Sequence, residues 1–170
     1  RKSRAAPPIG SIGLGPMGNP RALTLVGPGL PVLVGTRPPA RAEALARPGA
    51  RHAASVEALF EEAGAIILML AGTEAIDTVL RRGTPGFAAL VRDRTLVHMG
   101  TTSPAYSRDL AADTNAAGGR YVEAPVAGSR GPAQEGKLVV MLAGDAADVG
   151  AVRPLLAPLA ATVFECGEVP

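Results

Sequence analysis

The sequence is poor in cysteine, aromatic residues and lysine. Among 170 residues it has one cysteine, Cys166, no tryptophan, and only two lysines, Lys2 and Lys137. A lone cysteine excludes a disulfide framework and a cysteine-based zinc site, and fits a reducing, cytoplasmic location. The two histidines and scattered acids have no metal-ligand spacing, so we expect no metal. Aromatic residues make up only 3%, which argues against a base-stacking surface for nucleic acid.

Long apolar runs and charge of one sign are also lacking. The longest apolar run, residues 65–71, is far shorter than the roughly 20 residues that span a bilayer as a helix. Residues 1–8 are basic without an apolar segment behind them, which predicts a disordered N-terminal segment rather than a signal peptide. The net charge is +2 with interspersed signs, so neither a membrane nor a nucleic-acid partner is expected.

What the sequence does have is an alternation of short apolar runs with helical patterns. Strands are predicted over 9–13, 32–34, 65–70, 96–99, 138–142 and 163–164. Helices are predicted over 19–26, 38–46, 55–62, 73–82, 104–117 and 146–159. Runs that are apolar on both faces suit a parallel sheet covered on both sides. We therefore predict a doubly wound α/β fold of the Rossmann type, mainly parallel, over residues 9–170.

A glycine pattern follows the first predicted strand. Gly13, Gly15 and Gly18 satisfy G-x-G-x-x-G between a strand and a predicted helix. The first glycine permits the tight turn, the second lets the backbone approach a pyrophosphate, and the third lets helix and strand pack closely. The helix N-terminus then presents free N–H groups to phosphate. The pattern predicts a dinucleotide site, with a ligand-free glycine loop as the alternative.

The end of the second strand bears on the choice of cofactor. An NAD site requires an acid about 20 residues after the glycines, to bind the ribose 2′-hydroxyl. Arg37 stands there instead, and no acid occurs until Glu43. A guanidinium suits a 2′-phosphate, so NADP is preferred over NAD. The alternative is that Arg37 only faces water.

These residues resemble the β-hydroxyacid dehydrogenase family. The segment 13–18 is similar to the family's opening G-L-G-x-M-G. Segments 36–45 and 98–104 are similar to N-R-T…K-A-E-x-L and D-x-S-T-x-x-P. Segment 123–138 is similar to D-A-P-V-S-G-G/S…A-x-x-G-x-L. The resemblance covers nearly all of residues 9–167. It implies hydride transfer between a nicotinamide cofactor and a small 3-hydroxy acid, or a semialdehyde or 2-oxo acid.

The resemblance also implies roles for individual residues. The turn that holds the pyrophosphate would comprise Gly13, Leu14, Gly15, Pro16, Met17 and Gly18. The 2′-phosphate would be surrounded by Thr36, Arg37 and Pro38, and the adenine-side ribose by Leu70 and Ala71. Thr101 would lie near the nicotinamide and the substrate. The substrate carboxylate would face Ala127, Gly128 and Ser129.

The sequence departs from the family pattern at several positions. Ala127 and Gly100 stand where the family has serines, and His98 replaces an aspartate. A histidine there is expected to be packed or capping, with ligand contact as the alternative. The family's catalytic lysine lies on a helix beyond a strand like 163–164, followed by an all-helical domain. Because the sequence ends at Pro170, we expect both the catalytic lysine and the helical domain to be absent from this chain.

Two other functions stay open at this point. Without a catalytic residue, the chain could be a non-catalytic NADP-binding or interaction module. Imine reductases have a similar N-terminal half, although they usually lack the A-P-V-x-G-S pattern found at residues 124–129. For an enzyme of the resembled family, the expected partner is a small-molecule hydroxy or oxo acid substrate. A homo-oligomer stays open, because the sequence does not give the oligomeric state.

Overall fold

The computed structural model describes residues 7–13, 32–35, 50–127 and 137–168. Its strands are β1 (Ile9–Ile12), β2 (Val32–Gly35), β3 (Ala50–His52), β4 (Ala65–Leu68), β5 (Thr95–His98), β6 (Arg120–Glu123), β7 (Val126–Ala127), β8 (Leu138–Gly144) and β9 (Ala160–Glu165). Its helices are α3 (Val56–Glu62), α4 (Thr73–Leu80), α5 (Pro85–Val91), α6 (Pro104–Ala116) and α8 (Ala146–Leu156).

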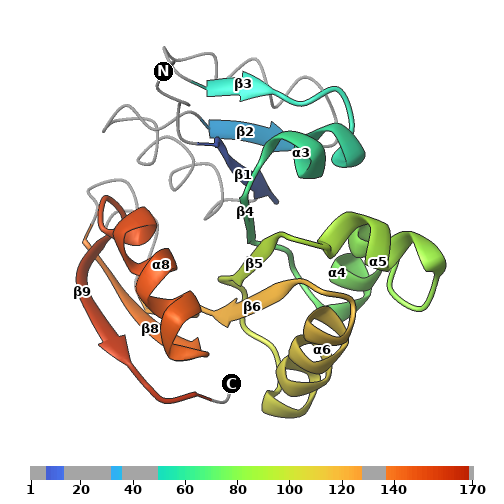
Figure 1. The fold of residues 1–170 in the computed structure, drawn as a ribbon. Coiled ribbons are helices and arrows are strands. Elements are labelled where there is room, and N and C mark those ends of the chain that lie inside the picture. Colours follow the sequence, from blue (N-terminus) through green and yellow to red (C-terminus); the bar gives the residue numbers. More distant parts are fainter. Residues whose placement is uncertain (1–6, 14–31, 36–49, 128–136, 169–170) are drawn as a thin grey trace.

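The strands form one sheet in the order β3-β2-β1-β4-β5-β6-β8-β7, with β9 beside β8 (Figure 1). The first six are parallel, which is the strand order of a dinucleotide-binding Rossmann sheet. β8 pairs antiparallel with β6 and with β7, and parallel with β9. The predicted mainly parallel α/β fold is therefore confirmed, although the strand predicted over 138–142 runs against its neighbour β6.

The register aligns the carboxyl ends of the central strands. Ile12, the last residue of β1, pairs with Gly35 of β2 and with Leu68 of β4. Leu68 in turn pairs with His98, and His98 with Glu123, the last residues of β5 and β6. Loops that leave these strands therefore start from one common edge. In sheets of this kind, ligands bind outside that edge, where the strand order reverses.

Alternating side chains of the central strands supply two apolar cores, one on each face of the sheet. Ile66, Leu68 and Leu96 join a cluster with residues of α3, α4, α5 and α6. Ile67 and Val97, which point to the opposite face, join a cluster with residues of α8. Side chains that are apolar on both faces explain why these strands read as continuous runs. Figure 1 shows α4, α5 and α6 grouped away from α8.

The helix caps agree with the sequence signals. Ser55 Oγ accepts a hydrogen bond from the Ala58 N–H at 3.1 Å, at the start of α3. Ser103 Oγ accepts one from the Tyr106 N–H at 3.2 Å, and Pro104 occupies the first turn of α6. These bonds satisfy amides that have no partner within the helix. α8 ends at Leu156, earlier than predicted, and contains Pro154 in its last turn.

Four elements were not predicted, each for a physical reason. β3 is a three-residue strand in which Arg51 and His52 are exposed, so it has no apolar pattern. α5 begins with a proline and a glycine, which are typical of turns, and Thr84 is its cap. β6 and β7 are short and flank a proline. β9, which was predicted, extends over 160–165 rather than 163–164. The helices predicted over 19–26 and 38–46, and residues 1–6 of the predicted N-terminal segment, lie outside the described residues.

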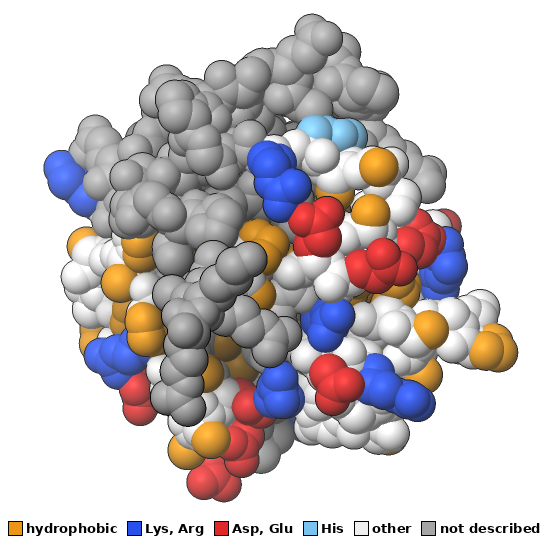
Figure 2. All heavy atoms as spheres, turned by 45° about the horizontal axis from the view of Figure 1, so that its top comes forward, with side chains coloured by type: hydrophobic (Ala, Val, Ile, Leu, Met, Phe, Trp, Pro, Cys, Tyr) orange, Lys and Arg blue, Asp and Glu red, His pale blue; other side chains and the backbone are white. Residues whose placement is uncertain are grey.

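On the face that Figure 2 shows, acidic and basic side chains of the described residues lie next to one another, with no broad area of one sign. In the parts of the chain that the structure covers, no helix is both long enough and apolar enough to cross a membrane.

Candidate cofactor site

Gly13 lies at the end of β1, where the chain turns away from the sheet. Its φ of +103° belongs to a region that side chains rarely adopt. A Cβ atom at this position would overlap the carbonyl oxygen of Met69 and would lie 2.5 Å from the carbonyl carbon. The Met69 N–H meanwhile donates to the Ile12 carbonyl at 2.9 Å, so β1 and the chain after β4 are in close contact. Only glycine fits here, as expected for the first glycine of a phosphate-binding turn.

The loop after β4 lies directly beside Gly13. A Cβ atom on Gly13 would be 3.3 Å from Leu70 Cδ2, so two of the predicted site residues are neighbours. Leu70 is half-buried, and Ala71 is exposed. Gly72, with φ +89°, then starts α4. The loop therefore presents Leu70 and Ala71 at the edge where β1 ends.

The loop after β5 lies next to the loop after β4, at the same edge of the sheet. A Cβ atom on Gly100 would lie 3.3 Å from the Leu70 carbonyl oxygen and 3.0 Å from His98 Nε2. Gly100 is buried, whereas Thr101 is exposed. Gly13, Leu70 and Gly100 thus stand side by side at the ends of three adjacent strands, and Thr101 follows directly.

His98 closes β5 and is fully buried, with 0% of its surface exposed. Its Nδ1 and the Tyr121 hydroxyl are hydrogen-bonded at 2.9 Å. Burial lowers the pKa of His98 to about 4, because the charged imidazolium loses its hydration. Burial also raises the pKa of Tyr121 well above its ordinary value. Both rings are therefore neutral near pH 7. No described residue is hydrogen-bonded to His98 Nε2.

A second set of hydrogen bonds, from α6 and β6, holds the loop after β5. Ser107, fully buried in α6, donates its hydroxyl proton to Glu123 Oε1 at 2.7 Å. The Thr102 and Ser107 hydroxyls are 3.0 Å apart. Because the proton of Ser107 goes to Glu123, the Thr102 hydroxyl acts as the donor in this contact. The carboxylate at the end of β6 therefore orients the residue next to Thr101.

The substrate side of the predicted site is only partly described. Ala127 ends β7, is exposed and pairs with Val139 of β8. The predicted site residues that lie outside the described residues are Leu14, Gly15, Pro16, Met17, Gly18, Thr36, Arg37, Pro38, Gly128 and Ser129. The structure thus brings Gly13 and Leu70 together and puts Thr101 at the same edge. That edge is where sheets of this kind bind their ligands.

Sequence reasoning missed the polar groups behind the loop. His98 and Gly100 both differ from the family pattern. Residues two apart at a strand end lie on the same side of the sheet, so their spacing could have indicated that the two positions are neighbours. Tyr121, Ser107 and Glu123 gave no comparable signal, because their contacts with residues 98–102 are made across different elements.

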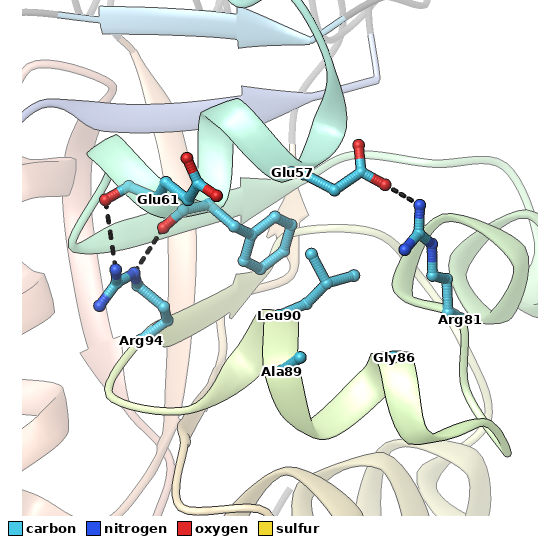
Figure 3. Close-up of a pocket in the computed structure, with 8 residues that line it drawn as sticks. Glu57, Glu61, Arg81, Gly86, Ala89, Leu90 and Arg94 are labelled. Carbon is cyan, nitrogen blue, oxygen red and sulfur yellow. Dashed lines mark hydrogen bonds and ion pairs between the residues drawn. The ribbon is translucent and has the colours of Figure 1, made fainter.

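A shallow hollow between α3 and α5 lies elsewhere on the molecule. Glu57 points toward Arg81 at one end, and the two form an ion pair (Figure 3). At the other end Arg94 donates to the backbone carbonyls of Phe60 and Glu61, at 2.5 and 3.2 Å (Figure 3). Arg94 directly precedes β5, so the hollow lies toward the amino ends of the strands. None of the described site residues lines it.

Comparison with known proteins agrees with this geometry. Residues 8–167 match the family described as the NAD binding domain of 6-phosphogluconate dehydrogenase. The chain is 34% identical over 147 residues to 2-hydroxy-3-oxopropionate reductase of Escherichia coli, covering 86% of this chain and 50% of that protein. It is 32% identical over 164 residues to human mitochondrial 3-hydroxyisobutyrate dehydrogenase, covering 95% of this chain and 48% of that protein.

Solved structures give the same result. Psf3 in complex with NADP⁺ and 2-OPP matches with a TM-score of 0.89 at 31% identity, covering 95% of this chain and 57% of that chain. An imine reductase of Streptomyces aurantiacus matches with a TM-score of 0.87 at 27% identity, covering 95% of this chain and 56% of that chain. The chain spans about half the length of the curated relatives it matches. It belongs to the β-hydroxyacid dehydrogenase family of oxidoreductases and corresponds to that family's N-terminal, NAD(P)-binding domain.

Proposed function

We propose that this chain binds NADP(H) at the carboxyl ends of β1, β4 and β5, as part of a reductase for small acids. The reaction would be reversible hydride transfer between nicotinamide and a 3-hydroxy acid, or the matching semialdehyde or 2-oxo acid. The observation that carries this proposal is Gly13, whose positive φ and closeness to the Met69 carbonyl exclude any side chain. A turn that admits only glycine at this edge fits close approach of a pyrophosphate.

The residues predicted from the sequence take defined roles in this proposal. The pyrophosphate is held by residues 13–18, and the 2′-phosphate by Thr36, Arg37 and Pro38. Leu70 and Ala71 cover the adenine-side ribose, and Thr101 faces the nicotinamide. Ala127, Gly128 and Ser129 receive the substrate carboxylate. Ala127 has no hydroxyl, so backbone N–H groups serve as donors there. When bound, the cofactor supplies the hydride, and the chain orients it and the acid.

The preference for NADP is tested by replacing Arg37. One charge-assisted hydrogen bond to phosphate contributes about 1.5–3 kcal/mol, so Arg37→Ala should weaken NADPH binding about 10- to 100-fold. NADH affinity should stay unchanged because NADH lacks the 2′-phosphate. Arg41→Ala serves as the matched control for loss of a nearby positive charge. Equal weakening of both nucleotides by Arg37→Ala would contradict the preference.

The substrate class is tested on the natural gene product in full, because this chain spans only about half the length of its relatives. Oxidation of NADPH would be followed spectroscopically with glyoxylate, succinic semialdehyde and 2-hydroxy-3-oxopropionate. Turnover of any of these supports the proposal. Tight NADPH binding without turnover would favour a non-catalytic module. The division of the chain at residue 8 and the pairing of subunits are tested by proteolysis and by native mass on the same sample.

Imine reduction is the second candidate function. It is favoured by one observation, the structural match to the imine reductase of Streptomyces aurantiacus at 27% identity. The A-P-V-x-G-S pattern at residues 124–129 argues for the acid reductases instead. Reduction of a cyclic imine with no reduction of oxo acids would make imine reduction the preferred function.

A further inference from the structure

The buried nitrogen of His98 is the polar atom at the strand ends that the described residues leave unsatisfied. The side chain is 0% exposed, and no described residue is hydrogen-bonded to Nε2. A buried nitrogen without a partner is unfavourable, and native structures rarely retain one without a water or a ligand. The position of His98, at the end of β5 and in register with the ends of β4 and β6, puts this atom beside the proposed cofactor site.

Nε2 faces the place of a missing side chain. A Cβ atom on Gly100 would lie 3.0 Å from Nε2, which is tighter than ordinary contact. The imidazole therefore fills the space into which a larger residue 100 would project. The other close group at that point is the Leu70 carbonyl oxygen, 3.3 Å from the same Cβ position. Leu70 itself is next to Gly13, so Nε2 lies among the loops that form the proposed site.

The remaining contacts of His98 fix its ring and leave Nε2 without a hydrogen-bond partner among the described residues. Tyr121, on β6, occupies Nδ1 at 2.9 Å. Glu123, Tyr106 and Arg82 are the titratable and charged groups that act on Tyr121. Glu123 accepts from Ser107 rather than from the imidazole. The neutral imidazole has one N–H and one bare nitrogen, so Nε2 can donate or accept, depending on which nitrogen carries the proton.

We propose that His98 Nε2 takes the place of the side chain missing at residue 100 and hydrogen-bonds the nicotinamide half of the bound cofactor. The partner is a carboxamide or ribose hydroxyl, since both can donate and accept. This inference rests on the proposed function and adds a cofactor-contacting side chain to it. It also accounts for His98 and Gly100 occurring together, because a Cβ at residue 100 crowds the imidazole.

Nitrogen-15 NMR of the imidazole tests the contact without altering His98. The full chain is prepared without a histidine tag and with His52→Gln, so that His98 is its only imidazole. NADP⁺ and nicotinamide mononucleotide should shift the Nε2 resonance. Adenosine 2′,5′-bisphosphate should bind and leave that resonance in place, because it lacks the nicotinamide half.

The outcomes separate the inference from the proposed function. Saturable NADP⁺ binding by calorimetry with an unchanged Nε2 resonance would overturn the role of His98 and leave the function standing. An equal shift with adenosine 2′,5′-bisphosphate would overturn it too, by showing general ordering of the loop. No NADP⁺ binding at all would overturn both.

Two variants give an independent readout in affinity. His98→Asn should weaken NADP⁺ about threefold to tenfold, the effect of one hydrogen bond, and leave adenosine 2′,5′-bisphosphate unchanged. Gly100→Ala should also weaken NADP⁺, but less in the His98→Asn background, because asparagine is shorter than histidine. Strictly additive effects of the two changes would contradict the coupling.

Discussion

The carboxyl ends and the amino ends of the strands are built from different kinds of polar contact. At the carboxyl ends, His98 and Ser107 are fully buried, and two glycines lie against neighbouring carbonyls. At the amino ends, the hollow between α3 and α5 is bordered by Arg81 and Glu57, which are paired and about half exposed. The first region buries polar side chains, where an unmade hydrogen bond is costly, and the ion pair of the second region lies where water screens it.

This difference separates a candidate site from ordinary surface. Burying polar groups is unfavourable unless each has a partner, so a buried group without a partner requires an explanation. Exposed ion pairs contribute little to stability and impose little order. The hollow has the more visible charges, yet the carboxyl ends of the strands are where sheets of this kind bind ligands. Substitutions in the two regions should therefore differ in their cost to stability.

Gly13→Ala should have the largest effect. The new methyl would overlap the Met69 carbonyl oxygen, at a φ of +103°, so both overpacking and backbone strain oppose it. We expect a loss of about 2–5 kcal/mol in the free energy of unfolding. Urea denaturation followed by circular dichroism measures it.

Two other glycines provide the controls for Gly13. Gly72 has a φ of +89°, and a Cβ atom there would have no described atom within 4 Å, so Gly72→Ala isolates the backbone strain. Gly150→Ala lies inside α8 with no described neighbour in that range, and should stabilise by about 0.5–1 kcal/mol. If Gly13→Ala cost no more than Gly72→Ala, the close approach of β1 to the chain after β4 would be wrong.

The pH dependence of stability should reveal His98. Its pKa is lowered to about 4 in the folded chain, against 6.5 unfolded, so the unfolded state binds the extra proton between these values. The contribution of the neutral His98 to the free energy of unfolding is therefore fully present above pH 6.5, and it falls as the pH drops toward 4. The limit is about 3 kcal/mol, from 1.36 kcal/mol per pKa unit.

Variants separate this effect from the titration of carboxylates. Urea unfolding at pH 7, 5.5 and 4.5 would be compared for the parent chain, His98→Asn and His52→Gln. His98→Asn should flatten the profile, and His52→Gln, at an exposed position, is the control for the loss of a histidine. A profile that is equally steep without His98 would mean that carboxylates alone cause the acid destabilisation.

Removing the Tyr121 hydroxyl should have a smaller effect. Tyr121→Phe leaves His98 Nδ1 buried without its partner, at an expected cost of about 1–3 kcal/mol. Tyr106→Phe is the matched control, because its hydroxyl donates to Asp77 at 2.7 Å in a half-buried position. Thermal unfolding of the two variants should rank Tyr121→Phe as the less stable. The reverse order would mean that His98 finds another partner.

Local patterns in the sequence sufficed to predict the fold and pointed to part of the candidate site. Continuous apolar runs predicted the central strands because both faces of a parallel sheet are covered, as at Ile66 and Ile67. Gly13 could be recognised because the turn excludes a side chain. β3 could not, because Arg51 and His52 are exposed and carry no apolar alternation.

The partners of His98 needed three-dimensional contacts. Tyr121 is 23 residues away and meets His98 only once β5 and β6 are paired. Ser107 reaches Glu123 across 16 residues, from α6 to β6. A single sequence holds no periodicity that links such positions. The residues of the site that could be predicted are those set by backbone geometry, and those missed are set by packing between elements.

Glu57→Gln should have the smallest effect, because it removes the ion pair with Arg81 at the edge of the hollow. Both side chains are about half exposed, so water already screens their attraction, and the loss should stay below about 1 kcal/mol. The difference from the parent chain should vanish in 1 M salt, where charges are screened within about 3 Å. Urea unfolding at low and high salt measures both. A loss as large as that of Tyr121→Phe, or one that persists in salt, would show that the hollow is as tightly organised as the strand ends, and the contrast between the two regions would fail.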